Sequence, residues 1–294
     1  MEPLEYPSVC LVTTCYNHED FVGDTIESVL SQGYPNLEYV VINDGSTDNS
    51  EEVIRRYSKH LHYWETWPGY RSNNVPALNR GFSSTSAQIM GWLSSDDLLV
   101  PNSLFVIGEV FSQLPEVQWL TGVALTADAL GRYVKVNKYR KNIYDFLVGD
   151  WRVIQQESTF WRRSLWEAAG SGLSEDYSPA FDAELWCRFF LCAEHYHLDS
   201  LVGAYRKVPQ SRSIKKTEQY HQLTESALNV LRESISREVS RWLPQNRIYR
   251  RVLRMIGSPQ LAPLVGKVLG RPEFQYKSIS YGTMTGRWSI YSEW

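Results

Sequence analysis

The chain runs AQIMGWLSSDDLLVP from Ala87 to Pro101, and this stretch predicts a strand that ends in acidic side chains. An apolar run of strand length is followed by two serines and the adjacent carboxylates of Asp96 and Asp97. Carboxylates so close together raise each other's pKa unless a cation lies between them. Hard oxygen ligands suit Mg²⁺ or Mn²⁺, which keep open coordination positions for phosphates. The alternative is a helix N-cap with an acidic first turn, and the stretch alone favours the two interpretations equally.

Two strand-and-helix units precede this stretch. Val9 to Thr14 and Glu38 to Ile42 are apolar, β-branched runs that predict buried strands. Apolar residues at helical spacing follow each run, over Phe21 to Gln32 and Glu52 to Tyr57. Strands that alternate with helices in this way predict an α/β fold of the Rossmann type, with a mostly parallel sheet flanked by helices.

Polar clusters occupy the predicted ends of three strands, at Thr14 to Asn17, Asn43 to Asp48 and Ser94 to Asp97. Because ligands bind at the carboxyl ends of parallel strands, we expect these clusters to converge. Tyr16 could then offer its face to a planar base, and Asp44 could accept a hydrogen bond from a ring imide. The acids of the third cluster would supply the metal for the phosphates of such a nucleotide. The alternative for Asp44 is a plain turn.

The chain contains, in this order, LVTTCYNHEDFVGDTIESVLSQGYPNLEYVVINDGSTDNSEEVI, PALNRGF and IMGWLSSDD. In composition, order and spacing these segments resemble the N-terminal half of the family 2 glycosyltransferases, the GT-A-fold group that uses nucleotide sugars. The resemblance extends more loosely through IQQESTFWRRSLWEAAG and FDAELWCRF to about residue 206. It implies a GT-A-like domain that transfers a sugar with inversion at the anomeric carbon by one direct displacement.

The resemblance also implies roles for individual residues. Thr14 and Tyr16 would contact the nucleotide base, and Asp44 would hydrogen-bond it. Asp96 would lie near the ribose, and Asp97 would coordinate Mn²⁺ or Mg²⁺ on the diphosphate. The full predicted nucleotide-sugar site comprises Thr14, Tyr16, Asn17, Asp44, Arg71, Asn79, Ser95 and Asp96.

Several positions leave alternatives open. Arg71 could place a cation near the diphosphate or be a solvated loop charge. Asn79 lies in a segment that resembles the family's helix behind the nucleotide site, where it would order neighbouring loops. Residues 155–158, QQES, could offer donors to a sugar hydroxyl, although ordinary loop groups are the favoured interpretation. Where many relatives carry a histidine that is sometimes counted as a metal ligand, this chain has Val208, so the metal would have fewer protein ligands or be less strictly required.

Asp182 is the candidate catalytic residue. It directly precedes the apolar helical run AELWCRFFLCA, and the resemblance implies that the acid at this position is the general base. The alternative is an N-cap. Glu175 and Asp176 are the nearest rivals for the catalytic role.

His195 and His197 alternate in a predicted strand shortly before Asp199, which imitates a metal cluster. No third ligand follows at a fitting spacing. A half-exposed strand is therefore the favoured interpretation.

The charge distribution divides the chain into two parts. Residues 1–205 hold 14 Lys and Arg against 27 Asp and Glu, whereas residues 206–294 hold 16 against 6. We predict a catalytic domain over residues 1–210 and a basic, mainly helical C-terminal extension over residues 211–294. One helical stretch of the extension separates an apolar face from Arg247, Arg250, Arg251 and Arg254. This helix could lie on an anionic membrane, or it could pack against the catalytic domain or a twin subunit.

The predicted function is transfer of a sugar from a nucleotide-diphosphate donor, with UDP as the expected nucleotide, to a hydroxyl of a glycan or lipid-linked saccharide in polysaccharide or glycoconjugate synthesis. The acidic front part argues against nucleic acid as a partner, and a homo-oligomer is compatible with the sequence. No apolar run approaches ~18 residues, so we expect a cytoplasmic protein that could meet the inner face of the membrane peripherally. The alternatives are a nucleotidyltransferase, for which TTCYNHED lacks the usual glycine-rich basic loop, and a non-catalytic glycan-binding protein on a transferase scaffold.

Overall fold

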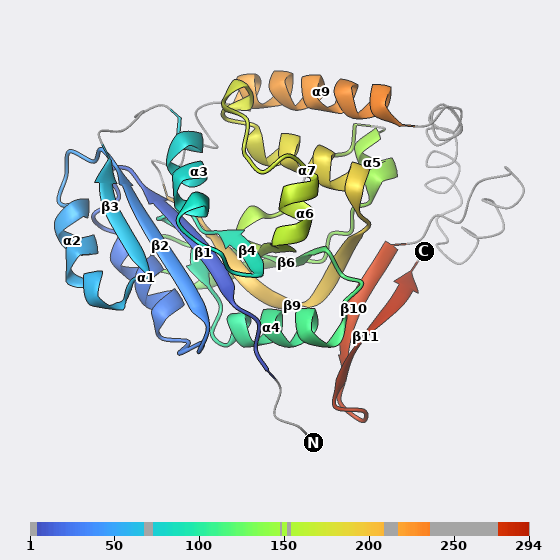
Figure 1. Ribbon diagram of the computed structural model, residues 1–294, viewed down its shortest axis with the longest axis horizontal. Helices are drawn as coiled ribbons and strands as arrows, with labels where there is room; N and C mark the ends of the chain where they lie inside the picture. The colour runs from blue at the N-terminus through green and yellow to red at the C-terminus, as the bar shows by residue number, and fades with distance from the viewer. Residues whose placement is uncertain are drawn as a thin grey trace, which may run out of the picture.

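A mixed sheet of 11 strands forms the centre of the computed structural model, with the order β11-β10-β9-β6-β8-β4-β1-β2-β3 (Figure 1). Two short strands lie off this path, where β5 pairs with β9 and β7 pairs with β6. Helices cover both faces of the sheet, and each face has its own apolar core. The structure describes residues 5–67, 73–147, 149–151, 154–208, 217–235 and 276–293.

The N-terminal part forms the parallel half of the sheet. Its elements are β1 (Val9–Cys15), α1 (Val22–Leu30), β2 (Leu37–Asp44), α2 (Ser50–Arg56), η1 (Ser58–His60) and β3 (Tyr63–Trp67). β1 pairs in parallel with both β2 and β4, and its apolar residues are buried because helices cover both faces of the sheet. On α1, Val22, Ile26 and Val29 recur at helical spacing and are buried. The predicted α/β fold with parallel strands is therefore confirmed.

The stretch around the two aspartates contains α3 (Val75–Ser83), β4 (Ile89–Trp92), β5 (Leu98–Leu99) and α4 (Ser103–Gln113). Gly81 lets α3 approach β1 closely, since a Cβ there would lie 2.4 Å from Cγ1 of Val12. No helix begins at Asp96 or Asp97. The chain enters β5 first, and Asn102 occupies the N-cap position of α4. The alternative interpretation of the two aspartates as a helix N-cap is therefore wrong.

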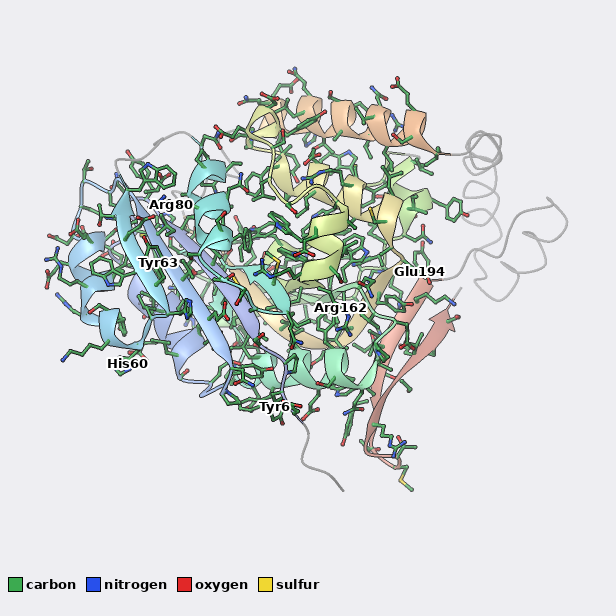
Figure 2. The ribbon with its side chains drawn as sticks, in the orientation of Figure 1. Tyr6, His60, Tyr63, Arg80, Arg162 and Glu194 are labelled. Atoms are coloured by element: carbon green, nitrogen blue, oxygen red, sulfur yellow. The ribbon has the colours of Figure 1, made fainter. Side chains whose placement is uncertain are left out.

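The second half of the sheet is mixed. It contains β6 (Trp119–Ala127), β7 (Tyr133–Asn137), α5 (Ile143–Leu147), η2 (Gln156–Ser158), β8 (Thr159–Arg162), α6 (Arg163–Ala168), η3 (Glu175–Tyr177), α7 (Phe181–Cys192) and β9 (His195–Arg206). β8 lies between β4 and β6 and runs antiparallel to both. Arg162, labelled in Figure 2, ends β8 and donates to the main-chain carbonyls of Val117 and Phe111, at 2.8 and 2.7 Å.

An aromatic core joins α7 to the sheet. The ring of Trp186 on α7 stacks between Trp92 and Trp119, with centroids 5.6 and 5.5 Å away. His195 packs against Trp119 at 4.2 Å and is buried, as is His197. The expectation of a half-exposed strand at these histidines is wrong, because the strand has neighbours along both edges and apolar cores on both faces.

The C-terminal elements pack on this same body. α9 (Thr217–Ser234) lies along α7 and α5, and the hairpin of β10 (Tyr276–Gly282) and β11 (Arg287–Glu293) extends the sheet beyond β9 (Figure 1). The four arginines from Arg247 to Arg254 lie outside the described residues. Within the described part of the chain, no helix is long and apolar enough to cross a membrane.

Candidate active site

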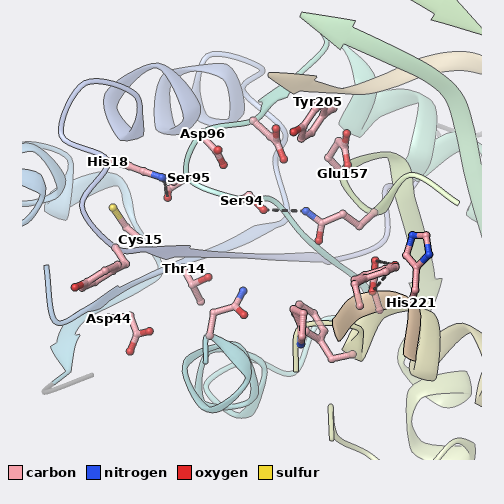
Figure 3. A pocket seen from close by; sticks show the side chains of 18 of the residues that line it. Thr14, Cys15, His18, Asp44, Ser94, Ser95, Asp96, Glu157, Tyr205 and His221 are labelled. Atoms are coloured by element: carbon pink, nitrogen blue, oxygen red, sulfur yellow. Dashed lines mark hydrogen bonds between the residues drawn. The ribbon is translucent and has the colours of Figure 1, made fainter. Parts of the chain in front are cut away.

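A pocket of about 460 Å³ opens at the carboxyl ends of β1, β2 and β4 (Figure 3). The three polar clusters meet there, as the strand order requires. Most of the predicted site residues line the pocket, namely Thr14, Tyr16, Asp44, Ser95, Asp96, Asp97 and Asp182.

Two of the predicted site residues that the structure describes do not line the pocket, and a third lies outside the described residues. Asn17 connects two loops, since its Oδ1 accepts from the main-chain N–H of Thr47 at 2.7 Å. Asn79 binds both main-chain groups of Leu173, at 2.9 and 2.8 Å, and so fixes the loop that leads towards α7. Arg71 lies outside the described residues.

Hydrogen bonds fix the loops that follow β1, β2 and β4 relative to one another. The main-chain N–H of His18 donates to Ser50 Oγ at 3.0 Å, and the His18 ring lies 2.8 Å from Ser95 Oγ. Asp44 ends β2 and is only 2% exposed. These contacts preorganise the three strand ends as one surface.

Hydrogen bonds from α1 and β9 hold the loop that carries Asp96 and Asp97 in place. Thr25 Oγ1 donates to the main-chain carbonyls of Ser95 and Asp97, at 2.9 and 2.8 Å. The main-chain N–H of Arg206 donates to Asp97 Oδ1 at 2.8 Å. Burial raises the pKa of Asp97 well above its usual value, and the charges of Glu157 and Asp96 raise it further.

Glu157 is a pocket residue that the sequence reasoning treated as an ordinary loop group. It lies in η2, is 3% exposed and lines the pocket beside Gln156, whose Nε2 donates to Ser94 Oγ at 2.8 Å. Burial raises the pKa of Glu157 to about 8, and the charges of Asp96 and Asp182 contribute. An acid directly before a buried apolar strand was the available signal, because glutamate is rarely buried without a role.

Asp182 lines the pocket from α7. α7 begins at Phe181 with Ala180 at the N-cap position, so the interpretation of Asp182 as the cap is wrong. The hydroxyl of Tyr220 on α9 lies 3.1 Å from each carboxylate oxygen of Asp182 and shares its single proton between them. Burial raises the pKa of Asp182 to about 6. Tyr220 was missed because it lies beyond the segment that carries the family resemblance.

The lining fits a divalent cation bound together with a diphosphate. The described lining contains aspartates and a glutamate but no Lys or Arg. An anionic ligand would therefore be repelled without added positive charge. Carboxylate oxygens are suitable ligands for Mg²⁺ or Mn²⁺. Among the residues that the structure describes, no group of three or more His, Cys, Asp or Glu could hold a metal alone. Phosphate oxygens of the ligand would complete the coordination of a cation held by these carboxylates.

The N-terminal part of the chain is similar to known glycosyltransferase sequences. Residues 10–119 match the family model described as glycosyl transferase family 2. Over 121 residues, the chain is 31% identical to a poly-beta-1,6-N-acetyl-D-glucosamine synthase of Staphylococcus epidermidis, which covers 41% of this chain and 29% of that protein. An uncharacterized glycosyltransferase of Rickettsia conorii is 26% identical over 267 residues, covering 86% of this chain and 41% of that protein. The chain thus spans less than half the length of either relative.

Solved structures share the fold. The S. aureus TarS fragment 1-349, in complex with UDP-GlcNAc, superposes with a TM-score of 0.63 and 14% identity, covering 78% of this chain and 67% of that one. The mannosyltransferase PcManGT from Pyrobaculum calidifontis, in complex with GDP-Man and Mn2+, gives a TM-score of 0.54 and 15% identity, covering 90% and 87%. The fold is therefore that of the GT-A glycosyltransferases.

Proposed function

We infer that the protein is a nucleotide-sugar-dependent glycosyltransferase, because residues 10–119 match the model of glycosyl transferase family 2 and its pocket brings polar groups from three strand ends together with the carboxylate of Asp182. The second of these observations carries the proposal. Thr14, Asp44 and Asp97 lie at three strand ends, and Asp182 faces the same pocket from α7. A donor bound between them would present its reacting carbon to Asp182.

The proposed donor is a UDP-linked sugar. Asp44 would accept a hydrogen bond from the base, and Thr14 and Tyr16 would contact it. Asp97, with Asp96 beside it, would hold Mn²⁺ or Mg²⁺. The bound cation would stabilise the negative charge that develops on the leaving diphosphate.

Asp182 would act as the general base in a single inverting displacement. Its carboxylate takes the proton of the acceptor hydroxyl, whose oxygen bonds to the anomeric carbon as the bond to the diphosphate breaks and the diphosphate keeps the electron pair. A pKa of about 6 leaves the carboxylate ionised at neutral pH, yet makes it a stronger base than an exposed aspartate. The hydrogen bond from Tyr220, shared by the two carboxylate oxygens, fixes its orientation.

The proposed acceptor is a hydroxyl of a glycan or lipid-linked saccharide. The match to a polysaccharide synthase supports a place in polysaccharide or glycoconjugate synthesis. We place this reaction in the cytoplasm, with peripheral membrane contact through the basic residues of the predicted extension over residues 211–294.

A panel of nucleotide sugars tests the proposal. The purified protein is incubated with UDP-, GDP- and TDP-sugars, and thermal shift and nucleotide release are measured. We expect one or a few UDP-sugars to raise the melting temperature and to release UDP slowly by hydrolysis. Release of pyrophosphate from a nucleoside triphosphate would instead indicate a nucleotidyltransferase. Failure of every nucleotide sugar to bind would overturn the proposal.

A further inference from the structure

Glu157 has no hydrogen-bond partner for one of its buried carboxyl oxygens. Its Oε1 is buried and has no hydrogen-bond partner among the described residues, and the side chain lines the pocket. Leaving such a group unpaired is costly, typically on the order of 1 to 3 kcal/mol. A buried unpaired carboxyl at the wall of a binding pocket indicates that a ligand group completes it.

The residues around Glu157 hold it rigidly. The side-chain amide of Gln155 binds both main-chain groups of Leu125 on β6, at 2.8 Å each. The hydroxyl of Ser158 donates to the carbonyl of Gly203 on β9 at 3.0 Å and accepts from its N–H at 3.1 Å. Gly203 also lies tightly against η2, since a Cβ there would fall 2.0 Å from the Glu157 carbonyl oxygen. Glu157 is therefore a preorganised group rather than a mobile loop side chain.

The place of Glu157 in the pocket limits what it can contact. Glu157 lines the pocket together with Tyr205, and Figure 3 draws it apart from Asp44 at the end of β2. Its charge is close enough to interact with both Asp96 and Asp182. In an inverting displacement, the anomeric carbon lies between the leaving diphosphate and the general base. The transferred sugar would therefore occupy the space that Glu157 borders.

We propose that Glu157 hydrogen-bonds a hydroxyl of the transferred sugar and contributes to the choice of donor. The proposal rests on the proposed glycosyltransferase function. A sugar hydroxyl can both donate and accept, so it completes a buried carboxyl in either protonation state. A site built in this way also rejects a donor that lacks the hydroxyl, because the carboxyl is then left unpaired.

Calorimetry with UDP and with UDP-sugars tests the role of Glu157. The ligands are UDP-GlcNAc, UDP-glucose and UDP-galactose, and the variant is Glu157→Met, which keeps the side-chain volume and removes both oxygens. We expect the affinity for the preferred UDP-sugar to fall about tenfold or more, while the affinity for UDP stays within about twofold. Glu52→Met, on the exposed surface of α2, is the control and should change neither affinity.

Deoxy analogues of the preferred donor then identify the contact. Loss of the hydroxyl that Glu157 binds should weaken binding to the wild type, while Glu157→Met binds the analogue and the parent sugar equally. Equal UDP-sugar affinities in the wild type and Glu157→Met would overturn this inference and leave the transferase proposal intact. Absence of UDP-sugar binding in the wild type would overturn both. A melting temperature within a few degrees of the wild type excludes misfolding as the cause.

Discussion

At the scale of single residues, burial decides the chemistry of the pocket. Asp182 and Glu157 are ordinary carboxylic acids, yet loss of solvent raises the pKa of the first to about 6 and of the second to about 8. The same side chains on the surface would be ionised and weakly basic. Burial thus makes both acids weaker, and their carboxylates more basic, than exposed aspartate and glutamate side chains.

Asp182→Asn should separate the catalytic role of this residue from a structural one. The amide keeps the shape of the side chain but cannot take the acceptor proton, so we expect transfer to fall by about 10² to 10⁴. UDP affinity and melting temperature should stay close to wild type. In the wild type, kcat/KM should fall as the pH drops through about 6, because the base becomes protonated. Transfer at the wild-type rate by Asp182→Asn would direct attention to Glu175 or Asp176.

Tyr220→Phe tests whether Tyr220 positions the base. The substitution removes a donor to both carboxylate oxygens, and that donor stabilises the ionised form, so the pKa of Asp182 should rise. We expect the acidic limb of the kcat/KM profile to move to higher pH. Tyr281→Phe, at a half-exposed tyrosine of β10, is the control. An unmoved acidic limb would show that Tyr220 only fills space.

At the scale of secondary-structure elements, η2 joins the two halves of the site. Gln155, at its N-cap position, binds β6, while Gln156 binds the loop after β4 and Ser158 binds β9, so three contacts fix the position of a turn of three residues. α9 likewise fixes a side chain of the pocket, because it supplies Tyr220, which binds Asp182. Elements far apart in the sequence thereby fix the positions of Glu157 and Asp182, which local sequence could not bring together.

Gly203→Ala should test the contact between β9 and η2. The added Cβ would meet the main chain of Glu157, which cannot move as a flexible side chain would. We expect the free energy of unfolding to fall by about 1 to 3 kcal/mol, with weaker donor binding. Gly172→Ala is a matched control, because its Cβ would meet nothing within 4 Å. Chemical denaturation of both variants measures the difference, and equal stabilities would contradict the close contact.

At the scale of the whole molecule, the sheet brings strongly acidic loops to one edge. The described lining offers no Lys or Arg side chain to balance a diphosphate. Binding of an anionic donor should therefore depend on a divalent cation. The acidic balance of residues 1–205 agrees with this dependence.

The affinity for UDP should consequently depend on the presence of a divalent cation. Calorimetry with Mn²⁺ should show tight UDP binding that EDTA abolishes, and Asp97→Ala should weaken it by at least about tenfold. Glu52→Ala, on an exposed helix, should bind as the wild type does. UDP binding that is insensitive to both EDTA and Asp97→Ala would exclude the metal role of Asp97.

The sequence by itself determined the parallel half of the fold and the convergence of three polar clusters at one edge of the sheet. Local periodicity is sufficient to predict β1, β2, β4 and their helices, and the carboxyl ends of parallel strands must share one edge. Thr14, Asp44 and Asp97 followed from that rule. Asn79, by contrast, proved to support a loop outside the pocket.

Only the tertiary structure decided how the second half completes the site. The antiparallel place of β8, the pairing of β10 with β9 and the packing of α9 on α7 depend on contacts between distant segments, which no local period encodes. Burial follows from those contacts, and burial turns Glu157 from a loop acid into a pocket group and brings Tyr220 onto Asp182. A residue's neighbours, and hence its pKa, are set when the chain packs, so local sequence cannot specify them.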